Sequence, residues 1–244
     1  GSPRAVDLGL LDVGSYSTQP RSPLGTAGTP AAGNVVEAQR LANYVVGPWE
    51  VAPEINSRYA MGALALTGAN ALSVLGPNEL GAVSGRHNFV NGFATARQAE
   101  GQASLINAVL RFADPPSAAA ALRELAGIAA SDRSSAASEE RAVVIPGQPD
   151  AVATSSSIAD VATQRQWSAV RSFTTRGPYL LTELATSVRG PVPAVTLVAN
   201  TIDLQRRVID QFPAIEPAAF ADFAVDSTGL LARTLPLSPQ QASA

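Results

Sequence analysis

The feature that most constrains the fold is a pair of strand-like segments, 166–174 and 179–187, joined by the short segment 175–178. The joining segment contains Gly and Pro, which is typical of a hairpin with a four-residue turn. Segment 193–212 follows and separates apolar from polar residues onto opposite halves of a helical wheel, so we expect an amphipathic helix there. Two strands followed by a helix indicate antiparallel pairing with a helix packed on the sheet.

A similar order of elements occurs earlier in the chain. Segments 86–96 and 102–112 alternate loosely between apolar and polar residues, which predicts two strands. Asp114 and Pro115 then give a helix start, with an acidic N-cap and proline at the first helical position, and a helix over 115–130 is expected. The sequence therefore predicts an α+β fold in which antiparallel strands pack against helices, arranged in two similar strand-strand-helix units.

The rest of the chain is less regular. Asn34 stands three residues before Glu37, a spacing that predicts a capped helix beginning at Asn34. Residues 60–76 are apolar but interrupted by glycine, and we favour a helix over a buried strand. A short strand is expected over 141–145, and the serine- and alanine-rich residues 148–163 are expected to form a loop.

These assignments divide the chain into three parts. Residues 1–33 form an extended N-terminal arm, in which Gly1 and Ser2 are typical of the remnant of a cleaved tag. Residues 34–236 form a single α+β domain, and residues 237–244 form a C-terminal tail or linker.

Composition excludes several classes of function. The net charge is −3, and all 17 basic residues are Arg, so we expect no nucleic-acid partner. The chain contains no Cys and no Lys, which excludes a thiol nucleophile, a disulfide, a thiolate metal site and a Schiff-base lysine. No apolar run approaches the roughly 20 residues of a membrane-spanning helix.

Motifs for catalysis are also missing from the sequence. His87 is the only histidine, and without a Gly-x-Ser-x-Gly elbow it is expected to be an ordinary surface histidine. Asp226–Gly229 is similar to an aspartic-protease triplet but has one residue too many and no second copy, so a turn is expected. We therefore predict no catalytic residue, no metal site and no cofactor.

Four aromatic residues are candidates for a ligand-binding pocket. They are Trp49, Tyr59, Trp167 and Tyr179. Ligand sites are mostly apolar with few polar groups, which these side chains would provide. The alternative is that they fill the core and its edges.

Three stretches carry a resemblance to a known family. They are residues 11–21 (LDVGSYSTQPR), residues 109–115 (VLRFADP), and a discontinuous set that includes residues 177–179 and ends with residues 226–236 (DSTGLLARTLP). In order and content they resemble a family of actinobacterial, chiefly mycobacterial, cell-envelope lipoproteins of unknown function.

The resemblance implies an exported protein that is held at the membrane only by a lipid anchor on a cysteine preceding this sequence. The absence of any catalytic constellation favours a non-enzymatic module that binds an envelope lipid, a glycolipid or an exported partner protein. Two alternatives remain open from the sequence: an envelope-acting hydrolase and a purely structural component of an envelope assembly.

Overall fold

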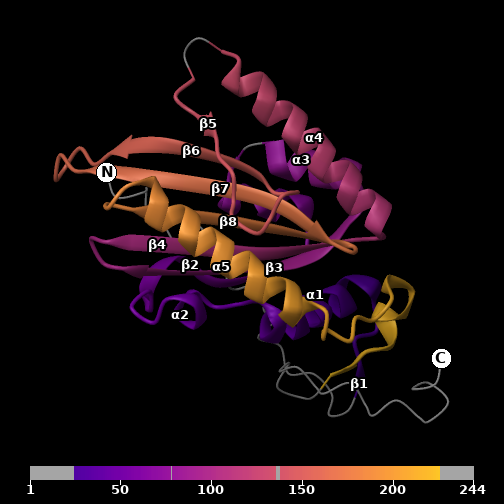
Figure 1. The fold of residues 1–244 in the computed structure, drawn as a ribbon. Helices are drawn as coiled ribbons and strands as arrows, with labels where there is room; N and C mark the ends of the chain where they lie inside the picture. The colour runs from indigo at the N-terminus through magenta and orange to yellow at the C-terminus, as the bar shows by residue number, and fades with distance from the viewer. Residues whose placement is uncertain (1–24, 78, 136–137, 226–244) are drawn as a thin grey trace.

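The computed structural model describes residues 25–77, 79–135 and 138–225. Its centre is a seven-stranded antiparallel sheet with the strand order β2-β3-β4-β8-β7-β6-β5 (Figure 1). The strands are β2 (Ser57–Leu66), β3 (Phe89–Ala99), β4 (Ala103–Phe112), β5 (Arg141–Ala142), β6 (Val152–Ala159), β7 (Gln166–Arg176) and β8 (Tyr179–Ser187). A separate two-stranded pair joins β1 (Gly25–Thr26) to β9 (Ala224–Val225). The predicted α+β fold class is confirmed.

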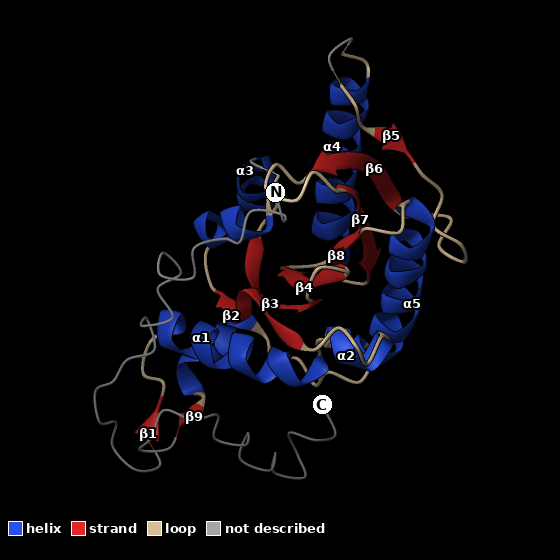
Figure 2. Cartoon of the chain, turned by 90° about the vertical axis from the view of Figure 1, so that its left-hand side faces the viewer, coloured by secondary structure: helices blue, strands red, loops and turns tan. Residues whose placement is uncertain are grey.

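Helices cover both faces of the curved sheet (Figure 2). One face packs against α1 (Pro30–Leu41), α2 (Pro48–Val51) and α5 (Pro191–Ile209), and we call it the α5 side. The other face packs against α3 (Glu79–Arg86) and α4 (Pro115–Arg133), and we call it the α4 side. Three 3-10 helices complete the described chain: η3 (Ala42–Tyr44), η4 (Ala69–Leu75) and η5 (Pro217–Asp222).

The two expected strand-strand-helix units are both present, as β3-β4-α4 and β7-β8-α5. Strands β4 and β8 pair at the centre of the sheet, and the two helices cover opposite faces. Helix α4 begins as predicted, because the Asp114 carboxylate accepts a 2.8 Å hydrogen bond from the Ser117 N–H and Pro115 occupies the first turn. The β7–β8 turn is tighter than expected: Arg176 pairs with Tyr179, which leaves a two-residue turn with Gly177 at φ +56°.

Three local predictions were wrong. Residues 148–163 were expected to be a loop but contain β6, whose small polar residues pair with β7 along the whole strand. Residues 60–76 were expected to be helical, but the segment continues β2 to Leu66 before η4. The first helix begins at Pro30 rather than Asn34, because the Thr29 hydroxyl caps it by accepting a 3.1 Å hydrogen bond from the Ala32 N–H. The two missed strands form because of long-range strand pairing, and the first helix begins earlier because its cap lies outside the apolar pattern. In each case the deciding residues lie outside the segment from which the prediction was made.

The core lies in layers on both sides of the sheet. On the α4 side, Ala118, Ala121 and Leu125 of α4 pack with apolar residues of β3, β4, β7 and β8. On the α5 side, Val198 and Ile202 are fully buried against β4, β7 and β8. The predicted packing of this amphipathic helix onto the 166–187 hairpin is therefore confirmed.

Some sequence features lie outside the described residues. They include residues 11–21 and 226–236, which carry much of the resemblance, most of the expected arm, and the tail at 237–244. Among the helices of the described residues, none combines the length and the apolar character that a membrane crossing requires.

Candidate functional site

A groove of about 720 Å³ opens at one end of the α5 side. Its walls come from α2 and the loop after it, the β3–β4 turn, the end of β8 and the first turns of α5. Figure 2 looks onto this end of the molecule, where α2 and α5 lie side by side. The volume falls within the roughly 300–1,000 Å³ of small-molecule sites, which makes the groove the first candidate for a binding site.

The lining of the groove is mainly apolar. Eight of its residues are Val51, Ala52, Ile55, Ala99, Ala103, Val192, Pro193 and Leu197. Four more carry uncharged hydrogen-bonding side chains: Gln102, Ser187, Thr196 and Asn200. The two charged residues, Glu54 and Arg189, balance each other in formal charge. The groove thus offers an apolar floor with neutral polar groups and no net charge.

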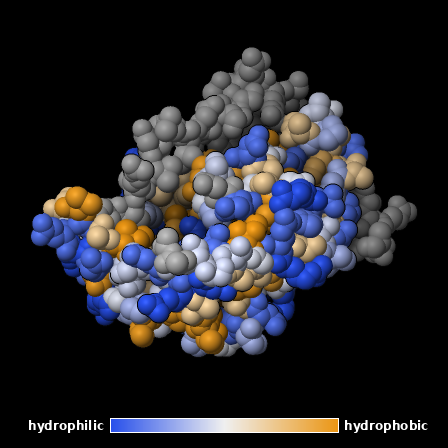
Figure 3. All heavy atoms as spheres, turned by 90° about the horizontal axis from the view of Figure 1, so that it is seen from above, coloured by the Kyte–Doolittle hydropathy of each residue, from blue (hydrophilic) through white to orange (hydrophobic). Residues whose placement is uncertain are grey.

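Exposed apolar side chains border this groove. Among the described residues, four large hydrophobic side chains are exposed, and two of them, Trp49 at 41% and Val192 at 73%, belong to the helices that form the groove. The Arg97 guanidinium of β3 lies 5.6 Å from the centre of the Trp49 ring, a contact that joins α2 to this strand. Elsewhere, the face in Figure 3 shows hydrophobic residues scattered among hydrophilic ones. Exposed apolar groups beside a groove mark a place where a ligand can cover them.

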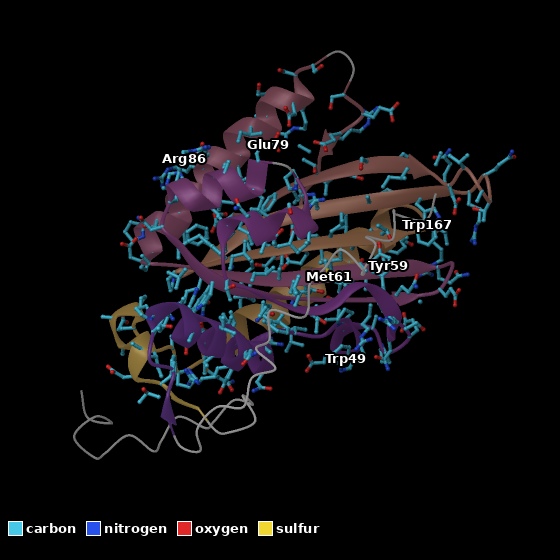
Figure 4. All side chains as sticks on the ribbon, turned by 180° about the vertical axis from the view of Figure 1, so that it is seen from behind. Trp49, Tyr59, Met61, Glu79, Arg86 and Trp167 are labelled. Carbon is cyan, nitrogen blue, oxygen red and sulfur yellow. The ribbon has the colours of Figure 1, made fainter. Side chains whose placement is uncertain are left out.

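The four aromatic candidates from the sequence are not gathered in one place. Trp49, Tyr59 and Trp167 lie toward one end of the molecule (Figure 4), while Tyr179 packs in a cluster with Phe93. Three of the four are buried: Tyr59, Trp167 and Tyr179. None of the four lines the groove or either of two other cavities formed by the described residues, one between α4 and β7 and one between η4 and α3. Burial raises the pKa of the Tyr59 and Tyr179 hydroxyls. Their ligand-binding role stays a prediction; Trp49 shares α2 with Val51, which lines the groove.

His87 lies in an ion cluster between α3 and α4. Its Nε2 is 2.6 Å from Glu124 Oε2, and Arg86 pairs with the same carboxylate. Hydrogen bonds from Arg86 and His87 lower the pKa of the Glu124 carboxyl. A carboxylate is therefore within reach of the histidine, as a hydrolase would need, but no serine or threonine hydroxyl of the described residues bonds to His87. A nearby cavity is lined by Arg86 but not by His87 or Glu124. This geometry ties the end of α3 to α4.

A row of buried polar side chains crosses the sheet beneath α5. Asn107 of β4 stands directly opposite Glu183 of β8, which in turn stands opposite Ser172 of β7. Ser172 donates a 2.7 Å hydrogen bond to Glu183 Oε1, and Asn107 donates to Gln205 Oε1 of α5 at 2.9 Å. Burial raises the pKa of the Glu183 carboxyl to about 8, so this group is mostly protonated at neutral pH. We call these residues, with Gln205, the polar row.

Comparison with known proteins then identifies the family. Residues 24–225 match the domain of unknown function DUF7373, N-terminal. The chain belongs to this family. The match agrees with the expectation of a family without an assigned function. A comparison with curated proteins gave no match. Among solved structures, this DUF7373 domain is similar to the extracellular domain of PknH from Mycobacterium tuberculosis, with 11% identity, a TM-score of 0.46, and coverage of 80% of this chain and 100% of that one.

The residues that line the groove of this DUF7373 domain were not predicted from the sequence. Thr196 and Asn200 are polar residues of the amphipathic segment 193–212, and in the sequence nothing distinguishes a groove wall from a solvent-facing surface. The signal that was available is Val192, an apolar residue between two prolines at the start of the helix. Among the residues that the structure describes, no three His, Asp or Glu side chains gather in a way that would hold a metal ion.

Proposed function

We propose that this DUF7373 domain is a non-enzymatic binding module of the cell envelope, and that its groove binds an amphiphile with an apolar chain and an uncharged, hydroxyl-rich head group, as in a glycolipid. The observation that carries the proposal is the lining of the groove: eight apolar residues, four neutral hydrogen-bonding side chains and one balanced pair of charges.

The chemistry of the occupant follows from this lining. An alkyl chain gains about 0.8 kcal/mol for each CH₂ group that it buries on the apolar floor. The amides of Gln102 and Asn200 and the hydroxyl of Thr196 can donate to and accept from sugar hydroxyls at the exposed rim. A strongly anionic head group would gain from Arg189 but would meet Glu54 in the same groove. A neutral head group therefore fits better.

The proposed location outside the cytoplasm rests on the sequence resemblance to envelope lipoproteins. A lipid anchor on a preceding cysteine would hold the domain at the membrane, where glycolipids are abundant. Fractionation of cells that produce the natural full-length protein, with and without that cysteine, tests this part. Recovery in the membrane fraction only when the cysteine is present supports anchoring, and recovery in the cytosol contradicts it.

Binding can be tested with octyl glucoside, used below its critical micelle concentration, and with octyl sulfate as the charged counterpart. We expect the glucoside to shift NMR signals of the groove residues and to do so equally at low salt and at about 0.5 M salt, where charge interactions are screened. If only octyl sulfate binds, and its binding disappears at high salt, an arginine-based anion site replaces the proposal. If neither binds, the purely structural alternative gains.

A pair of exposed valines provides the matched control. Val192→Glu places a charge in the groove, whereas Val144→Glu places one at an equally exposed valine elsewhere, 83% exposed compared with 73%. We expect the first substitution to weaken glucoside binding at least tenfold and the second to leave it unchanged. Equal effects from both would show that the groove is not the site.

A further inference from the structure

On the α4 side, Arg171 of β7 is a half-buried cation that forms no ion pair with a carboxylate of the described residues. Its Nη1 donates hydrogen bonds of 2.8 and 2.9 Å to the carbonyls of Leu75 and Gly76. No carboxylate of the described residues lies within 4.0 Å of its guanidinium, and no described acceptor bonds to Nε or Nη2. Burial lowers the pKa of Arg171 to about 10, so the side chain stays charged at neutral pH. The Glu140 carboxylate acts on this charge only from beyond ion-pair distance. A partly buried guanidinium without a hydrogen-bonded carboxylate favours an added anion.

A small cavity of about 60 Å³ adjoins Arg171. Its apolar walls are Pro77, Leu125, Ile128, Ala129, Val152 and Phe173. A water molecule needs about 10–15 Å³ of such volume, so the cavity has room for a ligand of about five non-hydrogen atoms. The cavity lies across the sheet from the groove, because Arg171 and Phe173 face α4.

Three acidic residues also line this cavity: Glu79, Asp132 and Glu140. Asp132 and Glu140 are exposed at the mouth, and none of the three reaches Arg171 closely enough for an ion pair. With one cation and three anions, the lining has a formal charge of −2. A simple anion would be repelled at the mouth, and a simple cation would leave Arg171 without a hydrogen-bonded carboxylate from the described residues.

We propose that this cavity is a binding site for a small zwitterion, such as a free α-amino acid the size of glycine. The carboxylate contacts Nε and Nη2 of Arg171, to which no acceptor of the described residues bonds, since guanidinium binds carboxylate through paired hydrogen bonds. The ammonium group faces Asp132 and Glu140 at the mouth, and the carbon skeleton lies against the apolar walls. This site is independent of the proposed groove and of its occupant.

The test compares glycine with its two halves, acetate and methylamine, by NMR titration of the full 244-residue chain. We expect glycine to bind at least tenfold more tightly than either, with shifts at residues of α4, β6 and β7. Equal binding of glycine and acetate overturns the zwitterion and leaves a simple anion site. No binding of any probe at 50 mM overturns the site altogether.

Variants at the mouth test the same proposal without touching a buried group. Asp132→Asn combined with Glu140→Gln should weaken glycine binding about tenfold while strengthening acetate binding, because the anions that select the ammonium group are removed. Arg171 itself is tested separately: Arg171→Met should abolish binding of glycine and acetate, and Arg171→Lys, which keeps the charge but loses the paired donors, should weaken both and serves where the methionine variant fails to fold. If the double variant binds glycine as the unchanged protein does, the proposed orientation is wrong.

Discussion

The two sides of the sheet are built from the same strands but are stabilised differently. On the α4 side, Leu125 and its neighbours pack against apolar residues such as Leu110 and Phe173. On the α5 side, the apolar contacts of Val198 and Ile202 are interrupted by the polar row. Alternation along each strand sends its residues to opposite faces, so one strand contributes to both kinds of packing. The two hairpin units are alike in topology and unlike in chemistry.

The difference teaches how each helix is positioned. Apolar burial is non-directional and tolerates small shifts, whereas hydrogen bonds between buried groups require specific distances and angles. Gln205 Oε1 accepts hydrogen bonds from the Val46 N–H and from Asn107, while its Nε2 donates to the Tyr44 carbonyl. One side chain therefore fixes α5 relative to β4 and to the segment between η3 and α2. That segment leads into α2, which forms a wall of the groove.

A charged cluster extends the polar character of the α5 side. Glu37 of α1 is fully buried and pairs with Arg40 at 2.6 Å and with Arg111 of β4 at 3.5 Å. Its Oε1 also accepts a 3.0 Å hydrogen bond from the Ile215 N–H. The arginines in turn lie against aromatic rings, Arg40 against Phe212 and Arg111 against Phe220. This cluster attaches the segment after α5 to α1.

The largest effect is expected from Glu37→Ala. The substitution leaves Arg111 and Arg40 without their carboxylate, and removing one partner of a buried ion pair costs about 3–5 kcal/mol. Urea denaturation should show that loss in the free energy of unfolding. Glu37→Gln, which keeps an acceptor for Ile215, should lose less. A loss below about 1 kcal/mol for the alanine variant would show that the cluster is solvated and contributes little.

The second prediction compares equivalent apolar replacements on the two sides. Gln205→Met keeps the shape of the side chain but leaves the Val46 N–H and the Tyr44 carbonyl unpaired and removes one of the two hydrogen bonds of the Asn107 amide, which should cost about 2–4 kcal/mol. Leu125→Met on the α4 side should cost less than about 1.5 kcal/mol. Thermal unfolding of both variants measures the contrast. Similar losses would mean that the hydrogen bonds of Gln205 contribute no more to the free energy of unfolding than the apolar packing of Leu125 does.

The sequence predicted much of this architecture but little of its polar chemistry. Strong local signals were sufficient for α4, with its Asp114 cap, and for the β7–β8 hairpin and α5. In contrast, β6 is a serine-rich strand whose stability comes from pairing with β7, and a local pattern does not contain that information. The bulge in β2, where Ala60 and Gly62 have positive φ, likewise obscured the strand.

The candidate sites were even less predictable. Glu183, Asn107 and Gln205 are far apart in sequence and meet only because the register places them together. In the sequence, nothing distinguishes Arg171 from the other arginines. Its environment depends on the turn at Leu75 and Gly76, whose carbonyls it contacts in the fold. The aromatic residues gave a visible signal, but three of the four are buried. Sites of this kind depend on long-range pairing, so residue type alone did not distinguish them from surface residues.

The third prediction concerns the pH dependence of the polar row. The pKa of Glu183 is raised to about 8 in the folded chain from an ordinary 4.5. As the pH rises, the unfolded chain therefore loses this proton at a lower pH than the folded chain does. Stability from this group is therefore greatest below about pH 4.5 and falls as the pH rises toward 8. Glu183→Gln should remove that dependence and stabilise the domain at pH 8 by roughly 3 kcal/mol relative to its effect at pH 5. Unfolding measured at both pH values checks this, and an equal effect at both would contradict the protonated state.

The smallest effect is expected on the exposed surface of α5, opposite the polar row. Arg207 lies 3.2 Å from Asp203 one turn earlier, and both side chains are about two-thirds exposed, at 66% and 65%. Such a pair contributes little because water screens the charges and two long side chains lose freedom, so Arg207→Ala should change the free energy of unfolding by less than about 0.5 kcal/mol. Urea denaturation at low and high salt measures it. A larger, salt-sensitive loss would mean that α5 is also held by charge on its outer face, and the contrast between the two sides of the sheet would then no longer rest on the polar row alone.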